Sequence, residues 1–236
     1  MQLTSKRNKI SVRRLFPLDD FIRNLRKDFR IELRNRRAFQ VAFAFGAITT
    51  VAVSLASGGR PFDPPVQAIL LWVITFFCAM NGLLHIFTRE EEEQTALFLR
   101  LNSSPEAVFG AKLVFNCIFF LSLQLVVTPL FLFFLQVDLP SPLAFAATVG
   151  AGGLAIAASV SLLGAIVAKA GGKGALFTVI SFPVVLPILW IAITTTILTL
   201  EGDSPAVKGN ILFLLAFSIA VMAISFLLFR YIWLDK

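Results

Sequence analysis

Long apolar runs, separated by short polar segments, make up the hydrophobic and polar pattern of this chain. Several runs hold at least 18 consecutive residues without a charge, enough to cross about 30 Å of hydrocarbon as a helix. The runs are continuous and lack the short alternating segments of a membrane barrel, so we expect an all-α integral membrane protein. We predict six spans, at residues 39–57, 66–87, 113–136, 143–168, 175–200 and 211–233.

The segment before the first span has a helical period of its own. Its apolar residues recur three or four positions apart and form one face with Leu18, Phe21, Ile22, Leu25, Phe29 and Leu33. The other face carries Arg23, Arg26, Lys27, Arg30 and Arg34. Such a helix is typical of a membrane interface with anionic lipid headgroups. Nucleic-acid binding is the alternative, but the position directly before a span favours the membrane surface.

Charge predicts the orientation of the spans. Only 15% of the 236 residues are charged, and the mean hydropathy is +0.83. If the N-terminus is cytoplasmic, nineteen of the 21 Lys and Arg residues fall on that side, against Arg60 and Lys208 on the other. The positive-inside rule then predicts that both termini are cytoplasmic. We divide the chain into a cytoplasmic N-terminal segment, 1–38, and a six-helix transmembrane domain, 39–236.

The connection between the second and third spans, residues 88–112, is the one long enough for cytoplasmic structure of its own. Thr88 and Glu91 fit a capping box at the start of a helix. Its first turn, where the helix dipole stabilises carboxylates, would hold Glu90, Glu91, Glu92 and Glu93. Apolar contact surface would follow at Leu97, Phe98 and Leu101. The segment is either a solvated acidic turn or a docking helix for a cytoplasmic partner.

Prolines predict where helices start or bend. Ser104 is expected to cap the next helix and Pro105 to occupy its first position. Pro183 and Pro187 lie one turn apart in the fifth span. Each removes a backbone hydrogen bond, so this pair is a candidate hinge, although membrane helices tolerate proline.

The spans offer packing surfaces and few reactive groups. The fourth span carries stripes of Gly, Ala and Ser, which let helices approach closely. No span has an ionisable acid or base at mid-depth, which disfavours proton-coupled transport. His85 is a lone histidine, and Cys78 and Cys117 form no CxxC motif. "AGGKG" lacks the P-loop spacing. We therefore predict no catalytic residues, no metal site and an energy source on another chain.

Three stretches carry a family resemblance: "DFIRNLRKDFRIELRNRR", "SSPEAVFGAKLVFN" at 103–116 and "SLLGAIVAKAGGKGALFTVISFPVVLP" at 161–187. They resemble CcmB, haem exporter protein B, the membrane permease subunit of the cytochrome c maturation ABC transporter. The residues that match the family's motifs are Ser104, Pro105, Ala111, Lys112, Asn116, Ser181, Phe182, Pro183 and Pro187. Gln94 departs from the pattern, because many members have glycine there.

This resemblance implies a fold like that of type-2 ABC exporters, with an N-terminal interfacial helix and a cytoplasmic coupling helix. It implies contact with the ATPase along 88–112, from Glu90 to Lys112. The implied partners are a CcmA-like ATPase that binds ATP, a haem-handling CcmC-like protein and a small CcmD-like subunit in a bacterial inner membrane. Haem would be a possible substrate, and no cofactor would bind this chain directly. A non-transporting scaffold that assembles a haem-maturation complex is the alternative function.

Overall fold

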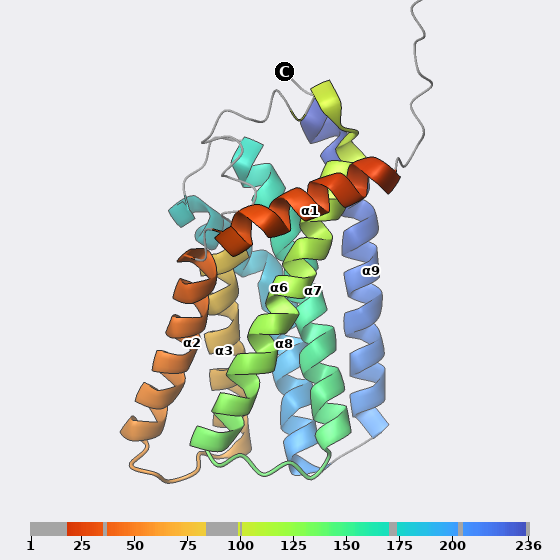
Figure 1. Cartoon of the computed structure of the whole chain (residues 1–236). Coiled ribbons are helices and arrows are strands. Elements are labelled where there is room, and N and C mark those ends of the chain that lie inside the picture. The colour runs from red at the N-terminus through yellow and green to blue at the C-terminus, as the bar shows by residue number, and fades with distance from the viewer. Residues whose placement is uncertain are drawn as a thin grey trace, which may run out of the picture.

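The computed structural model describes residues 18–34, 37–83, 99, 101–169, 174–202 and 205–234. All regular secondary structure in these ranges is helical. Six apolar helices run side by side, and a seventh, α1, crosses them near one end (Figure 1). In chain order the helices are α1 (Leu18–Arg34), α2 (Arg37–Ala56), α3 (Pro64–Leu83), α6 (Pro105–Phe134), α7 (Pro142–Lys169), α8 (Gly174–Glu201) and α9 (Pro205–Leu234).

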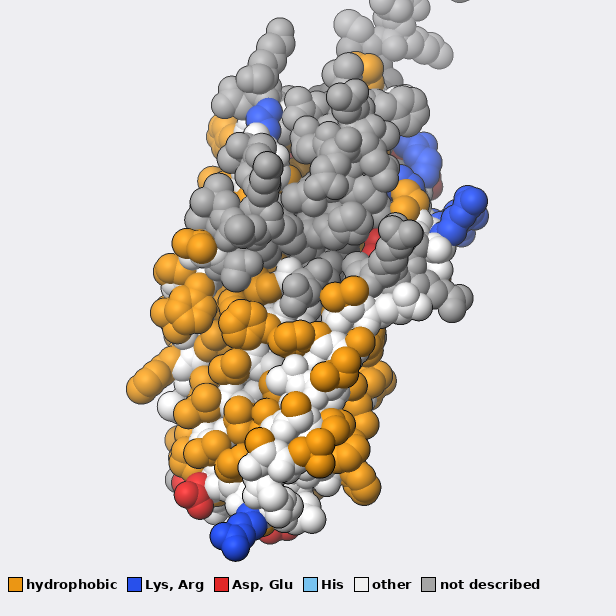
Figure 2. All heavy atoms as spheres, turned by 90° about the vertical axis from the view of Figure 1, so that its left-hand side faces the viewer, with side chains coloured by type: hydrophobic (Ala, Val, Ile, Leu, Met, Phe, Trp, Pro, Cys, Tyr) orange, Lys and Arg blue, Asp and Glu red, His pale blue; other side chains and the backbone are white. Residues whose placement is uncertain are grey.

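The length and composition of these helices confirm an integral membrane protein. Five of the described helices, α2, α6, α7, α8 and α9, are long and apolar enough to cross a membrane. The described apolar part of α3, Pro64–Met80, is shorter, so the count of six spans stays a prediction. Hydrophobic side chains cover much of the described surface between the two ends (Figure 2).

One helix start agrees with the sequence prediction and one differs from it. α6 runs unbroken from Pro105 to Phe134, and so begins at the proline expected to start it, eight residues before the predicted span 113–136. The predicted loop 201–210 is mostly helical, since α9 begins at Pro205. In both helices a proline occupies the first helical position, where its missing N–H costs nothing and its fixed φ favours a helix. Hydropathy marks where a span enters hydrocarbon, whereas these prolines mark where the helix starts.

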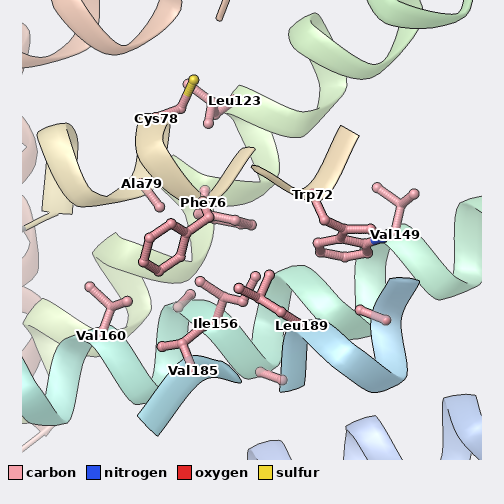
Figure 3. Packing of buried hydrophobic residues seen from close by; sticks show 14 of the residues in the cluster. Trp72, Phe76, Cys78, Ala79, Leu123, Val149, Ile156, Val160, Val185 and Leu189 are labelled. Atoms are coloured by element: carbon pink, nitrogen blue, oxygen red, sulfur yellow. The ribbon is translucent and has the colours of Figure 1, made fainter. Parts of the chain in front are cut away.

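α7 lies inside the bundle and contacts α3, α6, α8 and α9. Its small residues make room for large side chains of its neighbours. A Cβ on Gly152 would overlap the indole ring of Trp72, which reaches over from α3. The Trp72 Nε1 donates a hydrogen bond of 2.9 Å to the Thr196 Oγ1 of α8. Figure 3 shows Trp72 and Phe76 extending from α3 into this core.

Gly153 of α7 makes room for a polar side chain of α6. A Cβ at this position would overlap the amide of Gln124, which is buried. The Gln124 Nε2 donates a hydrogen bond of 3.0 Å to the Val149 backbone oxygen of α7. Hydrogen bonds between helices and small residues at the contact both stabilise packing within a membrane. The predicted packing role of the small residues is therefore confirmed at Gly153, and Gly152 has the same role although it lies outside the predicted stripes.

Candidate functional site

One end of the molecule carries the elements that sequence analysis assigned to a cytoplasmic partner. α1, the start of α6 and the end of α9 lie together there (Figure 1). Of the predicted coupling segment 88–112, the structure describes Leu99 and residues 101–112. The predicted docking residues Glu90, Glu91, Glu92, Glu93, Leu97 and Phe98 lie outside the described residues.

The start of α6 is fixed by a side-chain cap. Ser104 has an extended backbone (φ −73°, ψ 146°), and its Oγ accepts a hydrogen bond of 3.3 Å from the Ala107 N–H. Pro105 follows at the beginning of the helix. The predicted cap is therefore confirmed. Just before it, Leu99 is buried whereas Leu101 is 76% exposed, so Leu101 remains accessible on the described surface.

α1 holds the residues that precede this cap. The Arg23 Nη2 donates a hydrogen bond of 3.2 Å to the Asn102 backbone oxygen. The Asn24 Nδ2 donates another of 3.2 Å to the Ser103 Oγ, and Asn24 is buried. Arg23 is itself oriented by an ion pair of 2.7 Å with Asp20. These contacts join the N-terminal helix to the end of the predicted coupling segment.

The apolar residues of α1 divide between two environments. The Phe29 ring meets the Phe115 ring of α6 edge-on, at 4.8 Å between centroids. The Phe21 ring lies against Gly110, where a Cβ would come within 3.5 Å of it. Leu25 is also half-buried against the main core. The structure therefore divides the predicted apolar face, because it leaves exposed Leu18, Ile22 and Leu33.

The burial of three charged residues of α1 and α6 escaped the sequence analysis. Asp28 and Glu32 are 2% and 3% exposed, although they belong to a helix expected to bury only its apolar face. Lys112 of α6 is 2% exposed, so its side chain lies inside the protein and not on a docking surface. The sequence does contain a pattern that could have predicted the burial on α1. Asn24, Asp28 and Glu32 recur every four residues and form a polar stripe. Buried charges are stable only when other groups pair with them.

The candidate hinge lies within an unbroken helix. Pro183 and Pro187 are both internal to α8 and both exposed. Proline removes the N–H that would bond the carbonyl four residues earlier, so Val179 and Pro183 lose their helical donors. A hinge at this point stays a prediction.

The bundle interior offers polar contacts between helices. The Asn116 Nδ2 of α6 donates a hydrogen bond of 2.8 Å to the Ser161 Oγ of α7. Ser161 in turn donates to the Ala157 backbone oxygen at 2.7 Å. Throughout the described ranges, His, Cys, Asp and Glu form no group of three or more that could hold a metal ion. What the geometry offers is helix packing and a fixed helix start.

A protein-family model described as CcmB protein matches residues 19–229. The chain belongs to the CcmB family. Membership makes it a membrane component of the haem-export ABC transporter of cytochrome c maturation, in the class of permease subunits. Such subunits associate with an ABC ATPase and other maturation proteins and are not ATPases themselves. No curated protein gave a significant match.

Proposed function

We propose that this CcmB-family chain converts ATP hydrolysis on a CcmA-like subunit into motion of its membrane helices. That motion would serve haem export or release of a haem-loaded chaperone during c-type cytochrome assembly. The observation that carries the proposal is the family match over residues 19–229. CcmC-like and CcmD-like proteins would complete the complex in a bacterial inner membrane, with both termini of this chain in the cytoplasm. ATP would bind the partner, and haem would be cargo.

The hydrogen bonds at the start of α6 support a route for this coupling. A force on the segment before Ser104 reaches α6 directly, because Ser104 caps that helix. It also reaches α1, through the bonds to Asn102 and Ser103. α6 then contacts α2, α3, α7 and α9. A displacement of this segment would therefore move most of the bundle together.

The proposal assigns distinct roles to the predicted site residues. Glu90, Glu91, Glu92 and Glu93 would face basic residues of the ATPase, and Leu97, Phe98 and Leu101 would fill its groove. Ser104 and Pro105 would transmit the force. Lys112 would act indirectly, since its side chain is buried. Pro183 and Pro187 would let α8 bend.

Reversal of the acidic cluster tests the docking step. Exposed ion pairs contribute about 0–1 kcal/mol each, so Glu90→Lys alone should do little. Replacement of Glu90 to Glu93 together by lysine should abolish salt-resistant binding of the ATPase, measured by pull-down. It should also abolish cytochrome c maturation in cells. Leu97→Asp and Phe98→Asp should do the same, because each would bury a charge without a partner. Normal pull-down and maturation in all three variants would leave 88–101 as a solvated turn.

Reconstitution tests the transport step itself. The purified complex in liposomes should hydrolyse ATP at a rate that responds to haem or to the haem chaperone. A complex that assembles and matures cytochrome c, but hydrolyses ATP at the same rate with and without these ligands, would favour a non-transporting scaffold.

A further inference from the structure

The outward face of α1 differs from the face that holds the bundle. The inward side is occupied by the contacts of Phe21 and Phe29 with α6. The helix crosses the flank of the bundle close to one end (Figure 1). On the outward side, Leu18, Ile22 and Leu33 are 69%, 51% and 60% exposed. A helix that exposes several apolar residues near one end of a membrane-spanning bundle suits the boundary between hydrocarbon and headgroups.

Two arginines on this outward face have no partner in the described structure. Arg26 and Arg30 are exposed and lie one helical turn apart, about 6 Å along the axis. Neither forms an ion pair or hydrogen bond with another described residue. Their neighbours differ, since Arg23 is paired with Asp20 at 2.7 Å and Lys27 lies 3.4 Å from Asp28. Arg26 and Arg30 are therefore available to an external anion.

The same two arginines line an open hollow along α1. The described residues around it all belong to this helix and carry four positive charges and one negative charge. They are Asp19, Ile22, Arg23, Arg26, Lys27, Arg30 and Ile31. A guanidinium binds phosphate through two parallel hydrogen bonds. Ile22 and Ile31 add apolar surface beside the cations. A phospholipid needs both, because its phosphate binds cations and its acyl chains contact apolar side chains.

We propose that Arg26 and Arg30 bind the phosphate of an anionic phospholipid in the leaflet beside α1. This inference is independent of the proposed function, since it needs no other subunit. A lipid suits the site better than an acidic protein segment, because exposed Leu18, Ile22 and Leu33 share the face with the cations. The bound lipid would hold α1 at the membrane boundary, next to the segment that α1 bonds to.

Native mass spectrometry of the full chain, titrated with phosphatidylglycerol in detergent micelles, tests this site. Arg26→Gln/Arg30→Gln should weaken phosphatidylglycerol binding roughly 30-fold, the effect expected for the loss of two basic residues at an anionic lipid. Phosphatidylcholine should bind both proteins equally weakly. Arg26→Lys/Arg30→Lys should keep part of the affinity, since it keeps the charge and loses the paired geometry.

The chain supplies a matched control for charge. Arg60→Gln/Lys208→Gln removes two exposed cations from loop and helix positions far from α1 in the sequence and should leave phosphatidylglycerol binding unchanged. An equal loss in this control, or full binding by Arg26→Gln/Arg30→Gln, would overturn the proposal. So would displacement of the lipid by equimolar inorganic phosphate, which would show a site for the free anion. If the arginine variant binds lipid normally but loses the ATPase in pull-down, the face is a protein interface instead.

Discussion

At the scale of single residues, glycines that lack a side chain allow the helices of this bundle to pack closely. Gly152 lies under the Trp72 indole and Gly153 lies under the Gln124 amide, and neither position has space for a Cβ. Gly150, on the same helix, would meet nothing within 4 Å if it carried a Cβ. The three glycines look alike in the sequence, yet two of them are contact points and one is open.

Gly152→Ala should therefore destabilise the protein by about 1–3 kcal/mol, the usual cost of overpacking a core. Gly150→Ala should leave stability unchanged or raise it slightly, because alanine is the better helix former. Thermal denaturation of both variants in the same detergent measures the difference. Trp72→Phe should restore part of the loss in Gly152→Ala, since it removes the ring that the new methyl group meets. Equal stability of the two alanine variants would contradict the contact.

At the scale of elements, α1 combines two functions that its sequence shows only as one stripe. Phe21, Leu25 and Phe29 attach it to the bundle, while its other apolar residues remain outside. Asn24, Asp28 and Glu32 of the same helix are buried as well. One side of α1 thus packs against the bundle, and the other side presents an exposed, basic and apolar surface.

Phe21→Ser/Leu25→Ser/Phe29→Ser should release α1 from α6 and lower the amount of folded protein in membranes severalfold. A fully buried apolar side chain contributes about 1.5–3 kcal/mol, and these half-buried residues contribute part of that each. Quantitative immunoblotting of the membrane fraction and gel filtration in detergent measure the effect. The matched triple variant, with serine at Leu18, Ile22 and Leu33, should fold normally in detergent. Comparable loss in both triple variants would mean that α1 has no preferred attached side.

At the scale of the whole molecule, successive apolar helices run in opposite directions between two ends. The turns after α2 and α6 lie at the lower end in Figure 1, opposite the C-terminal end of α9. This arrangement agrees with the pairing of loops that the positive-inside rule predicts. Which end faces the cytoplasm is a prediction that rests on charge alone.

Single cysteines can assign the two ends. In a background without Cys78 and Cys117, cysteine at exposed Asp138 or Glu201 should react with a membrane-impermeant thiol reagent in intact cells. Cysteine at Leu101 or Tyr231, which are 76% and 75% exposed, should react only after the membrane is opened. The reverse pattern would overturn the orientation, and the docking proposal with it.

Local features of the sequence were enough to predict the class of the protein and most helix positions. Uninterrupted apolar runs require helices in hydrocarbon, because backbone groups have no other partners there. The period of α1 and the Ser-Pro pair before α6 predicted a helix and a cap that the structure confirms. Motifs distributed over three stretches were sufficient to identify the family. Each of these signals depends on residues close together in the chain.

What only the tertiary structure decided is which neighbour each side chain meets. The rotation of α1 about its axis depends on α6, so burial of Asp28, Glu32 and Lys112 did not follow from amphipathicity. The partner of Gln124 is Val149, 25 residues away on another helix, and the space for it depends on Gly153. Hydropathy measures transfer of a residue into lipid and carries no information about distant partners. The spans thus follow from the sequence, whereas polar contacts between them arise from packing in three dimensions.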